Sequence, residues 1–511
     1  MISNRHKKYV ILLALMVVFT SFNNLFPMHL TARADAPRGV SQLDLRSIKS
    51  IKIREGDVHR LILSPDERFL AVKFKRKGLL SLEGKALQIF DTSSGKAKFQ
   101  EKLTSKIDEG DSYKFSPDGR FLAVWFNSKK KGYSLQLFDV ARGKAKLKKT
   151  NVSSFKFSPD GKVLAVWFME GFQLFDFVSG RVKFSQKANV CFFEFSPDGR
   201  FLVVKSRDVG LQLFDVVSGR EKFSPKANVS SFKFSPDGRF LAVQFGRHLQ
   251  LFDIVSGREE FSQKINYVSS CEFSPDGRFL AVKFRDRSLQ LFDIVSGETK
   301  FQDKLTNLCI CSDCFRFSPD GRFLAVKFRD RSLQLFNVVS GEEAKFQDKL
   351  TDTCNFRFSP DGKVLAVEDF TEGFQLFDVA SRGAKFQDKL TANIYRYAFS
   401  PGGRFLVIKF RDSSLQLFDI ASGEVLLNLG QSGEFIFDST GKRLFVVSGG
   451  FVKEYELPTR DEYEEERIVG ACGVLKTLQE EKSTVGTRVG KKQVQLPGKT
   501  IVVPVWALPS L

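Results

Sequence analysis

The sequence predicts an all-β fold, a β-propeller of about ten four-stranded antiparallel blades that form one ring closed by the N-terminal strand. A small C-terminal helix and a hairpin are expected to follow the ring. Three observations predict this fold. A stretch of 25 residues is written almost twice, a Ser-Pro-Asp-Gly turn recurs about every forty residues, and each repeat holds two glycine turns but no apolar stretch at helical spacing.

The duplicated stretch shows how close the repeats are to one another. Residues 273–297 read FSPDGRFLAVKFRDRSLQLFDIVSG, and residues 317–341 differ from them at two positions only. A degraded copy of the turn, DSTGKR, begins at Asp438, and most intervals between turns are 38 to 44 residues, with one interval of 52 after the first. A period near forty predicts a repeat architecture in which each unit buries its faces against its neighbours. The serine that opens the turn is found at Ser64, Ser116, Ser158, Ser196, Ser235, Ser274, Ser318, Ser359 and Ser400.

The chemistry of one repeat predicts four short strands. In Ser-Pro-Asp-Gly the proline presets the backbone, the aspartate can bond nearby amides, and the glycine accepts a positive φ, so the four residues form a tight connection. A β-forming run such as Arg-Phe-Leu-Ala-Val follows, then a charged segment, then Leu-Gln-Leu-Phe-Asp and a Ser-Gly turn. A looser fourth run, such as residues 300–305, completes the unit. Four antiparallel strands every forty residues are typical of a propeller blade.

The pattern FSPDG-x-x-LAV followed by LQLFD and Ser-Gly resembles the WD repeat, and its SPDG portion is similar to TolB-type propellers of bacterial envelopes. The resemblance covers ten copies and roughly four-fifths of the chain, and it implies the propeller fold. Phenylalanine stands where the WD repeat has its tryptophan, and the Gly-His pair of that repeat is absent. The family's Asp-His-Ser-Trp network therefore cannot form, and we expect stacked phenylalanines instead. They are Phe90, Phe138, Phe175, Phe214, Phe252, Phe292, Phe336, Phe377 and Phe418.

Residues 1–34 have the layout of a signal peptide. Arg5, Lys7 and Lys8 precede an apolar run from Tyr9 to about Phe22, and residues 32–34 read Ala-Arg-Ala, a small-x-small cleavage site. The apolar core is short for a membrane span. We expect cleavage and export to a periplasm or beyond, with an uncleaved N-terminal anchor as the alternative. Because this segment holds four basic and no acidic residues, its removal changes the formal net charge from +20 to +16, which is still strongly basic.

Residues 35–457 are expected to form the propeller, and the segment at 41–54 lacks partner strands of its own. We predict that it supplies the outer strand of the last blade, which closes the ring and removes exposed sheet edges; a loose N-terminal arm is the alternative. The number of blades in the ring stays open between one ring of ten, a ring of seven or eight with extra repeats, and two smaller rings. The absence of a Pro/Gly/Ser-rich linker between repeats favours one ring.

The innermost strand of most repeats carries a charged residue two positions before the turn serine. The positions on either side of them are mostly aromatic and are predicted to face neighbouring blades. Long charged side chains need water, because burying them unpaired is costly, so we expect them to line a wide channel. The predicted channel-lining cations are Lys114, Lys156, Lys233, Arg316 and Arg357.

The connections between the second and third strands are rich in lysine and arginine. All such connections emerge at one end of a propeller, so that end is predicted to be basic, although acidic residues dilute it. Lys73, Lys205, Lys283, Lys327 and Lys409 are assigned to the same connections. A summed positive field attracts anionic partners, although charges kept for solubility are the plainer explanation. The predicted binding residues are Lys75, Arg76, Lys130, Arg207, Arg285, Arg287, Arg329, Arg331 and Arg411.

No catalytic constellation is found in the sequence. His59 and His248 lie outside any nucleophile or metal motif, and the recurring aspartates have a structural role inside their turns. The spacing Cys309-x-Cys311-x-x-Cys314 invites a metal or redox interpretation, but a structural site wants a fourth ligand, and small apolar fillers with one loop disulfide are the simpler interpretation. No metal and no cofactor are predicted.

Residues 458–511 depart from the repeat. A capping-box pattern at 459–462 and an apolar stripe to about Lys482 predict a helix, and the residues on either side of Pro497-Gly498 predict a hairpin. We expect an exported, non-enzymatic scaffold that binds a protein partner, or an anionic lipid or polysaccharide, through its channel mouth and basic loops. Export and the lack of RNA-module motifs disfavour nucleic acid. The alternative is an envelope hydrolase or lyase with its site at the channel mouth.

Overall fold

The computed structural model describes residues 47–53, 57–76, 84–102, 112–128, 132–177, 179–224, 229–246, 248–257, 259–300, 305–311, 314–344, 350, 352–369, 373–384, 394–459, 491–496 and 499–504. The chain divides into two units, Leu45–Glu456 and the remainder. In the described residues every regular element is a β-strand. The first unit is a propeller of ten small antiparallel sheets.

The first five blades each have four strands paired in chain order. They are β2 Asp57–Leu63, β3 Phe69–Arg76, β4 Gly84–Asp91 and β5 Ala97–Lys102; β6 Ser112–Phe115, β7 Phe121–Ser128, β8 Gly132–Asp139 and β9 Lys144–Thr150; β10 Val152–Phe157, β11 Val163–Phe168, β12 Gly171–Asp176 and β13 Val182–Lys187; β14 Val190–Phe195, β15 Phe201–Ser206, β16 Gly210–Asp215 and β17 Glu221–Phe223; β18 Val229–Phe234, β19 Phe240–Phe245, β20 His248–Asp253 and β21 Glu259–Asn266.

In the described residues, blades 6 to 8 have three strands each, and blades 9 and 10 have four. They are β22 Val268–Phe273, β23 Phe279–Phe284 and β24 Leu289–Asp293; β25 Phe315–Phe317, β26 Phe323–Lys327 and β27 Leu333–Asn337; β28 Thr353–Phe358, β29 Val364–Asp369 and β30 Gly373–Asp378; β31 Ile394–Phe399, β32 Phe405–Phe410, β33 Leu415–Asp419 and β34 Val425–Leu429; and β35 Phe435–Phe437, β36 Arg443–Ser448, β37 Phe451–Glu456 and β1 Ser47–Lys52.

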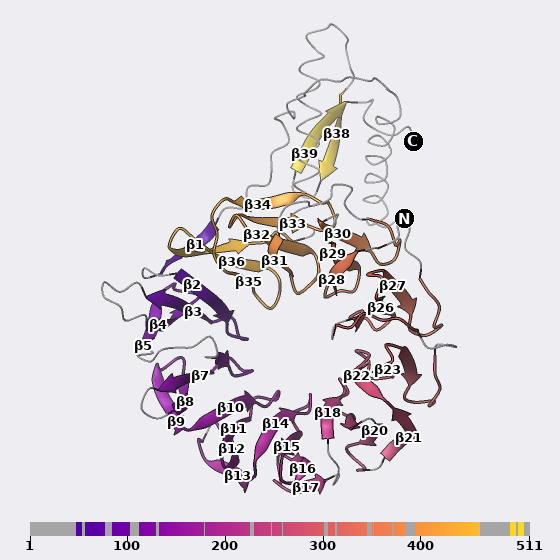
Figure 1. Cartoon of the computed structure of the whole chain (residues 1–511). Helices are drawn as coiled ribbons and strands as arrows, with labels where there is room; N and C mark the ends of the chain where they lie inside the picture. Colours follow the sequence, from indigo (N-terminus) through magenta and orange to yellow (C-terminus); the bar gives the residue numbers. More distant parts are fainter. Residues whose placement is uncertain are drawn as a thin grey trace. The chain divides into compact units, whose positions relative to one another are not determined.

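The predicted ring closure by the N-terminal strand is confirmed. The blades follow the chain around one ring, with the first strand of each blade nearest the centre, and β1 lies in the last blade beside the first (Figure 1). β1 pairs antiparallel with β37, and Ile51 is opposite Val452. Ile51 and Val452 share one buried cluster with Leu70 of blade 1 and Phe445 of blade 10. The strand therefore completes the tenth sheet and fills the contact between the two ends of the series.

The Ser-Pro-Asp-Gly sequence forms the expected turn between the first two strands of a blade. In blade 6 the buried Ser274 hydroxyl accepts a hydrogen bond from the Phe279 N–H at 2.8 Å and donates one to Asp276 Oδ1 at 2.5 Å. Gly277 has a φ of +74°, and a Cβ there would lie 3.4 Å from the Asp237 carboxylate of the preceding blade. The glycine therefore serves both the left-handed backbone conformation and the close approach of neighbouring turns.

An arginine–aspartate pair that the sequence analysis did not anticipate ties this turn to the third strand. Arg278, directly after the turn, bonds Asp293 at the end of β24 through Nη2 and Oδ2 at 2.9 Å, and its guanidinium lies over the Phe279 ring. Burial would raise the pKa of Asp293, but the Arg278 guanidinium and two backbone N–H groups lower it below its usual value. Blade 9 repeats the pair with Arg404 and Asp419 at 3.0 Å. This pair therefore links the turn between the first two strands to the end of the third strand in both blades.

Each described core cluster lies between two consecutive blades. The cluster between blades 2 and 3, for example, joins Phe121 and Leu137 to Phe155 and Val166. The phenylalanines that replace tryptophan are buried except Phe252, which is half-buried. The expected ring stacking occurs between Phe223 and Phe252, whose centroids are 5.1 Å apart. Burial between blades thus holds adjacent repeats together.

The fourth runs of blades 6, 7 and 8 lie largely outside the described residues. Among the residues that the structure does describe, isolated bridges continue the ladder, such as Leu289 with Leu305 and Phe292 with Thr299 in blade 6. In the second unit, β38 Lys491–Leu496 and β39 Lys499–Pro504 form the predicted hairpin. The predicted helix and the signal segment lie outside the described residues.

Candidate functional site

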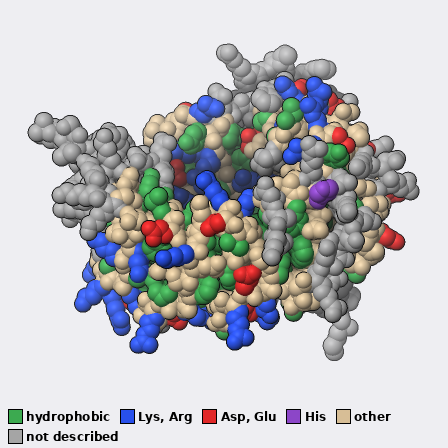
Figure 2. Space-filling view, turned by 60° about the horizontal axis from the view of Figure 1, so that its bottom comes forward, with side chains coloured by type: hydrophobic (Ala, Val, Ile, Leu, Met, Phe, Trp, Pro, Cys, Tyr) green, Lys and Arg blue, Asp and Glu red, His purple; other side chains and the backbone are tan. Residues whose placement is uncertain are grey.

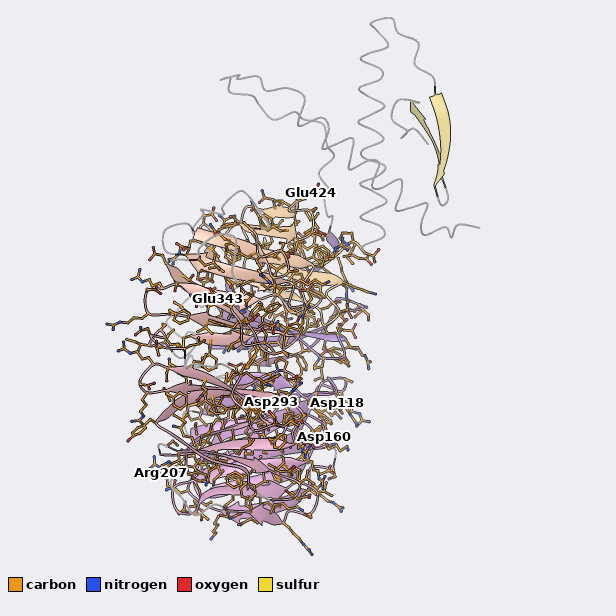
Figure 3. The ribbon with its side chains drawn as sticks, turned by 90° about the vertical axis from the view of Figure 1, so that its right-hand side faces the viewer. Asp118, Asp160, Arg207, Asp293, Glu343 and Glu424 are labelled. Carbon is orange, nitrogen blue, oxygen red and sulfur yellow. The ribbon has the colours of Figure 1, made fainter. Side chains whose placement is uncertain are left out.

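The basic face is the end of the ring formed by the turns between second and third strands. Figure 3 shows Arg207 at this end and Asp118 and Asp160, from turns between first and second strands, at the opposite edge. Lys75 and Arg76 belong to β3, but their side chains are not among the described ones, and Lys130 lies outside the described residues. The described arginines of the basic face are Arg207, Arg285, Arg287, Arg329, Arg331 and Arg411.

Blades 6 and 7 each present two arginines at this face through turns of identical sequence. In blade 6, Asp286 Oδ1 accepts the backbone N–H of Ser288 at 2.9 Å and its hydroxyl at 2.5 Å. Arg287 adopts a φ of +67°, which is uncommon for a residue with a side chain. The aspartate is engaged in shaping the turn, while the Arg285 side chain is exposed and that of Arg287 is half-buried. Blade 7 repeats the arrangement at 329–332, with a φ of +65° at Arg331.

The backbone of these turns also holds the entry to the following blade. The Arg287 carbonyl accepts the Leu308 N–H at 3.0 Å, and the Arg331 carbonyl accepts the Thr353 N–H at 3.0 Å. The Arg331 side chain lies 3.5 Å from Asp352, an exposed ion pair of the kind that contributes little to stability. The turns are therefore fixed through their backbone, and they present guanidinium groups on a rigid frame.

The lysines assigned to these connections lie instead in the second strands. Lys73, Lys283 and Lys327 are buried, and Lys205 and Lys409 are half-buried. The ammonium groups donate to backbone carbonyls of the next blade: Lys205 to Ser230 at 3.0 Å, Lys283 to Cys309 and Cys311 at 2.9 Å each, Lys327 to Cys354 at 2.7 Å, and Lys409 to Gly433 at 2.8 Å. We call this position the clasp position. Because their ammonium groups are engaged between blades, these lysines do not belong to the basic face.

Other residues fill the clasp position in two further blades. Trp125 Nε1 donates to the Val152 carbonyl at 2.8 Å, and Gln244 Nε2 donates to the Val268 carbonyl at 2.8 Å. A donor at this position therefore couples consecutive blades whatever its charge. The sequence signal was available, since Trp125 and Gln244 align with the lysines, but a recurring lysine alone does not distinguish a solvated charge from a bond between blades.

The predicted channel cations lie on innermost strands. Lys114, Lys233 and Arg357 are exposed, and Lys156 and Arg316 are half-buried. Figure 2 shows lysine and arginine side chains gathered in the hollow that the blades surround.

Some of these cations contact the neighbouring blade. Lys156 Nζ lies 3.7 Å from Glu194 and 4.8 Å from the centre of the Phe192 ring. The Arg357 guanidinium lies 5.9 Å from the Tyr397 ring centre. Lys156 is therefore partly neutralised by its acidic neighbour.

Two further inner-strand arginines were missed by the sequence analysis. Arg60 lies over the Tyr113 ring at 5.9 Å, and Arg396 bonds Glu434 at 2.9 Å while its guanidinium lies over Phe435 at 5.0 Å. Both stand four positions before their turn serine, on the same side of the strand as the predicted cations. Extending the alternation by one step would have found them.

The described cysteines are all free: Cys191, Cys271, Cys309, Cys311, Cys314 and Cys354. Among the described residues no three His, Cys, Asp or Glu side chains converge in a way that could hold a metal ion. The part of the chain that the structure describes also holds no helix of sufficient length and apolar character to span a bilayer.

The closed series of ten sheets defines the class: the chain folds as a ten-bladed β-propeller. No protein-family model and no curated protein sequence matches the chain. Among solved structures it is similar to the computationally designed Ika8 protein, with 12% identity over 60% of this chain and 96% of that one, and a TM-score of 0.36. It is also similar to a structure described as the eukaryotic initiation factor, with 16% identity over 66% of this chain and 93% of that one, and a TM-score of 0.48.

Proposed function

We propose that this propeller, of the WD-like or TolB-like repeat type, is an exported, non-enzymatic scaffold. It captures a protein or an anionic envelope partner through the basic face and the channel mouth. The observation that carries the proposal is the pair of identical turns in blades 6 and 7, which present arginines at one end of the ring on a backbone bonded to the next blade.

The chemistry of these turns suits an anionic partner. Guanidinium groups bind carboxylates and phosphates in a planar, two-point manner and lose little hydration on doing so. The cations in the central hollow extend the same field inward (Figure 2), and a field of one sign steers an oppositely charged partner toward the site. Such attraction weakens as salt rises.

A charge reversal at the basic face tests the proposal. We expect the quadruple variant Arg285→Glu, Arg287→Glu, Arg329→Glu and Arg331→Glu to lose salt-sensitive binding to vesicles containing phosphatidylglycerol and to acidic proteins of an envelope extract. Each basic side chain near an anionic surface contributes about 1 kcal/mol, so the loss of four should lower the affinity by about a thousandfold.

The matched control reverses four exposed charges at the opposite end of the ring, with Lys96→Glu, Arg181→Glu, Arg220→Glu and Lys442→Glu. This variant has the same net charge as the first and should keep most of the binding. Equal losses in both variants would show that net charge alone acts, and no loss in either would show that the arginines serve solubility. Turnover of model esters, lactones or glycans by the wild-type protein would favour the envelope hydrolase or lyase instead.

A further inference from the structure

The segment that joins blades 6 and 7 brings three cysteines to the basic face. Cys309 and Cys311 lie between the last bridge of blade 6 and the first strand of blade 7, and Cys314 directly precedes β25. The segment is bonded to the arginine turns of both blades, because the Leu308 N–H donates to the Arg287 carbonyl and the Arg329 N–H donates to the Asn307 carbonyl at 2.7 Å. The cysteines are therefore held in place rather than carried on a free loop.

Lys283 at the clasp position bends this segment. Its ammonium group donates to the carbonyls of both Cys309 and Cys311 at 2.9 Å, and its side chain is 5% exposed. At the same position in blade 7, Lys327 bonds the Cys354 carbonyl. Two carbonyls, two residues apart and turned toward one ammonium group, hold the backbone between Cys309 and Cys311 in a bend.

The bend brings Cys311 onto the sulfur of Cys309. The Cys311 backbone N–H donates to Cys309 Sγ at 3.3 Å. Cys309 is half-buried and Cys311 is exposed, whereas Cys314 is fully buried. Only the first two sulfurs therefore combine proximity with access from solvent.

The electrostatic surroundings favour a thiolate on Cys309. Burial would raise the pKa of Cys309, but hydrogen bonds from the Cys311 side chain and backbone N–H, together with the charges of Lys327 and Lys283, bring it below its usual value. Burial and the neighbouring Cys309 raise the pKa of Cys311 to about 11. The Cys309 sulfur is thus favoured as the attacking thiolate. Cys311 keeps its proton until Cys309 has lost its negative charge.

We propose that Cys309 and Cys311 form a thiol–disulfide exchange pair that reacts with anionic disulfides. The Cys309 thiolate attacks one sulfur of the disulfide R–S–S–R, which forms a mixed disulfide and releases R–S⁻. Cys311 then gives its proton to solvent and attacks Cys309 Sγ, which forms the Cys309–Cys311 disulfide and releases the second R–S⁻. The two cysteines are oxidised and the external disulfide is reduced to two thiols.

The arginines of blades 6 and 7 select the class of substrate. Arg287 and Arg329 contact the segment through their backbones, and their side chains give an anionic disulfide a local concentration above that of a neutral one. A disulfide between residues only two apart closes a small, strained ring, and strained disulfides are readily reduced again. The pair is therefore a reversible one. The inference does not depend on the proposed scaffold function.

The test uses the reduced full-length protein and dithiobis(nitrobenzoate), an anionic aromatic disulfide whose released thiolate is coloured. At neutral pH we expect a fast phase that releases two thiolates per chain and leaves no adduct on the peptide of residues 305–316, which trypsin cuts out with all three cysteines. Mass spectrometry should find this peptide two hydrogens lighter. Cys309→Ser should abolish the fast phase, and Cys311→Ser should release one thiolate and retain the adduct.

Cys354→Ser is the matched control. The Cys354 carbonyl accepts a hydrogen bond from Lys327, the lysine at the clasp position of blade 7, and Cys354 is half-buried like Cys309. This variant should leave the fast phase unchanged. Lys283→Met should slow the phase, because it removes both a charge that favours the Cys309 thiolate and the two hydrogen bonds that bend the segment. Thermal unfolding by circular dichroism verifies that each variant is folded.

Three results would each overturn the inference or one of its parts. Persistence of the fast phase in Cys309→Ser would place the reactive thiol elsewhere. Resolution of the adduct in Cys311→Ser would make Cys314, rather than Cys311, the partner of Cys309. Equal rates with a neutral and an anionic disulfide would remove the role of the arginines and leave the pair without substrate selection.

Discussion

At the scale of single residues, the contact between the two ends of the ring depends on Glu67. The first repeat reads Ser-Pro-Asp-Glu, so Glu67 stands where most other copies have glycine, and it adopts a φ of +60°. Its carboxylate accepts a bond from Arg443 Nη2 at 2.7 Å and from the Ser439 N–H at 3.0 Å, both in blade 10. Arg443 also binds Asp438 and Glu454. Glu67 thus adopts an unfavourable backbone conformation, and its hydrogen bonds to Arg443 and Ser439 link blade 1 to blade 10.

Replacing Glu67 should reveal this contribution through its pH dependence. Burial would raise the pKa of Glu67, but hydrogen bonds from Ser439 and Arg443 bring it below its usual value. A carboxyl whose pKa is lower in the folded state stabilises the fold above its unfolded pKa, and the effect is lost as the pH falls through the folded value. We expect Glu67→Gln to cost about 1–2 kcal/mol at pH 7 and progressively less as the pH falls below the usual pKa of a glutamate, measured by urea unfolding.

The exposed Glu342 supplies a control, and Glu342→Gln should leave the free energy of unfolding unchanged at both pH values. If Glu67→Gln were equally destabilising in acid and at neutral pH, the lost interaction would not be that of the carboxylate.

At the scale of elements, the turn between the first and second strands is the unit that the chain repeats. Its serine is buried in every described copy that has one, and in blade 6 it satisfies the backbone N–H of Phe279, five residues later. The tenth copy replaces serine with Asp438, whose carboxylate accepts the N–H groups of Lys442 at 2.9 Å and Arg443 at 3.1 Å. The turn therefore requires an oxygen acceptor at its first position, and either side chain supplies it.

Removal of that acceptor should destabilise one blade. Ser274→Ala leaves the Phe279 N–H without its hydroxyl partner inside the protein, and an unsatisfied buried donor costs about 1–3 kcal/mol. Ser296→Ala, in the exposed turn between the third and fourth strands of the same blade, should cost less than about 0.5 kcal/mol. Denaturant unfolding measures the totals, and amide hydrogen exchange should place the loss of protection in blades 5 to 7, because energies in repeat proteins are carried between neighbours. Equal costs for the two variants would contradict this account of the turn.

At the scale of the whole molecule, stability depends on whether the series of blades is closed. β1 comes from the N-terminal side of the propeller and completes a sheet whose other three strands lie about four hundred residues away. Without β1, β37 would present an unpaired edge, and the buried cluster between blades 10 and 1 would lose the side chain of Ile51. Closure therefore joins the first and last parts of the propeller by both a ladder and a core.

Two isoleucines of β1 allow the stability contributed by core packing to be distinguished from that contributed by backbone pairing. Ile51 is 2% exposed and Ile48 is 57% exposed. Ile51→Ala should cost about 2–5 kcal/mol, because it leaves a cavity between blades 10 and 1, while Ile48→Ala should change stability by less than about 1 kcal/mol. Thermal unfolding compares the two, and small-angle scattering shows whether the ring opens before it unfolds. A cost for Ile51→Ala no larger than that for Ile48→Ala would mean that the closure is held by backbone pairing alone.

The lack of partner strands around residues 41–54 indicated the closing strand. The sequence by itself also determined the repeat, its turns and its strand order, because these three features depend on contacts within one unit of about forty residues, where turn chemistry and the alternation of apolar side chains act over short distances. The predicted basic turns of blades 6 and 7 follow from the same local pattern, since Asp286 and Ser288 shape the turn from within.

Only the tertiary structure decided which charged residues act between blades. Lys283 and Lys327 look like members of a solvated basic loop in the sequence, yet the twist of each sheet directs their ammonium groups onto carbonyls of the next blade. The bond between Glu67 and Arg443 joins residues nearly four hundred positions apart, and it exists because ten wedge-shaped blades complete a full turn. The sequence of one repeat specifies the fold of one blade. The contacts that its side chains make with other blades depend on how the copies are arranged in the ring.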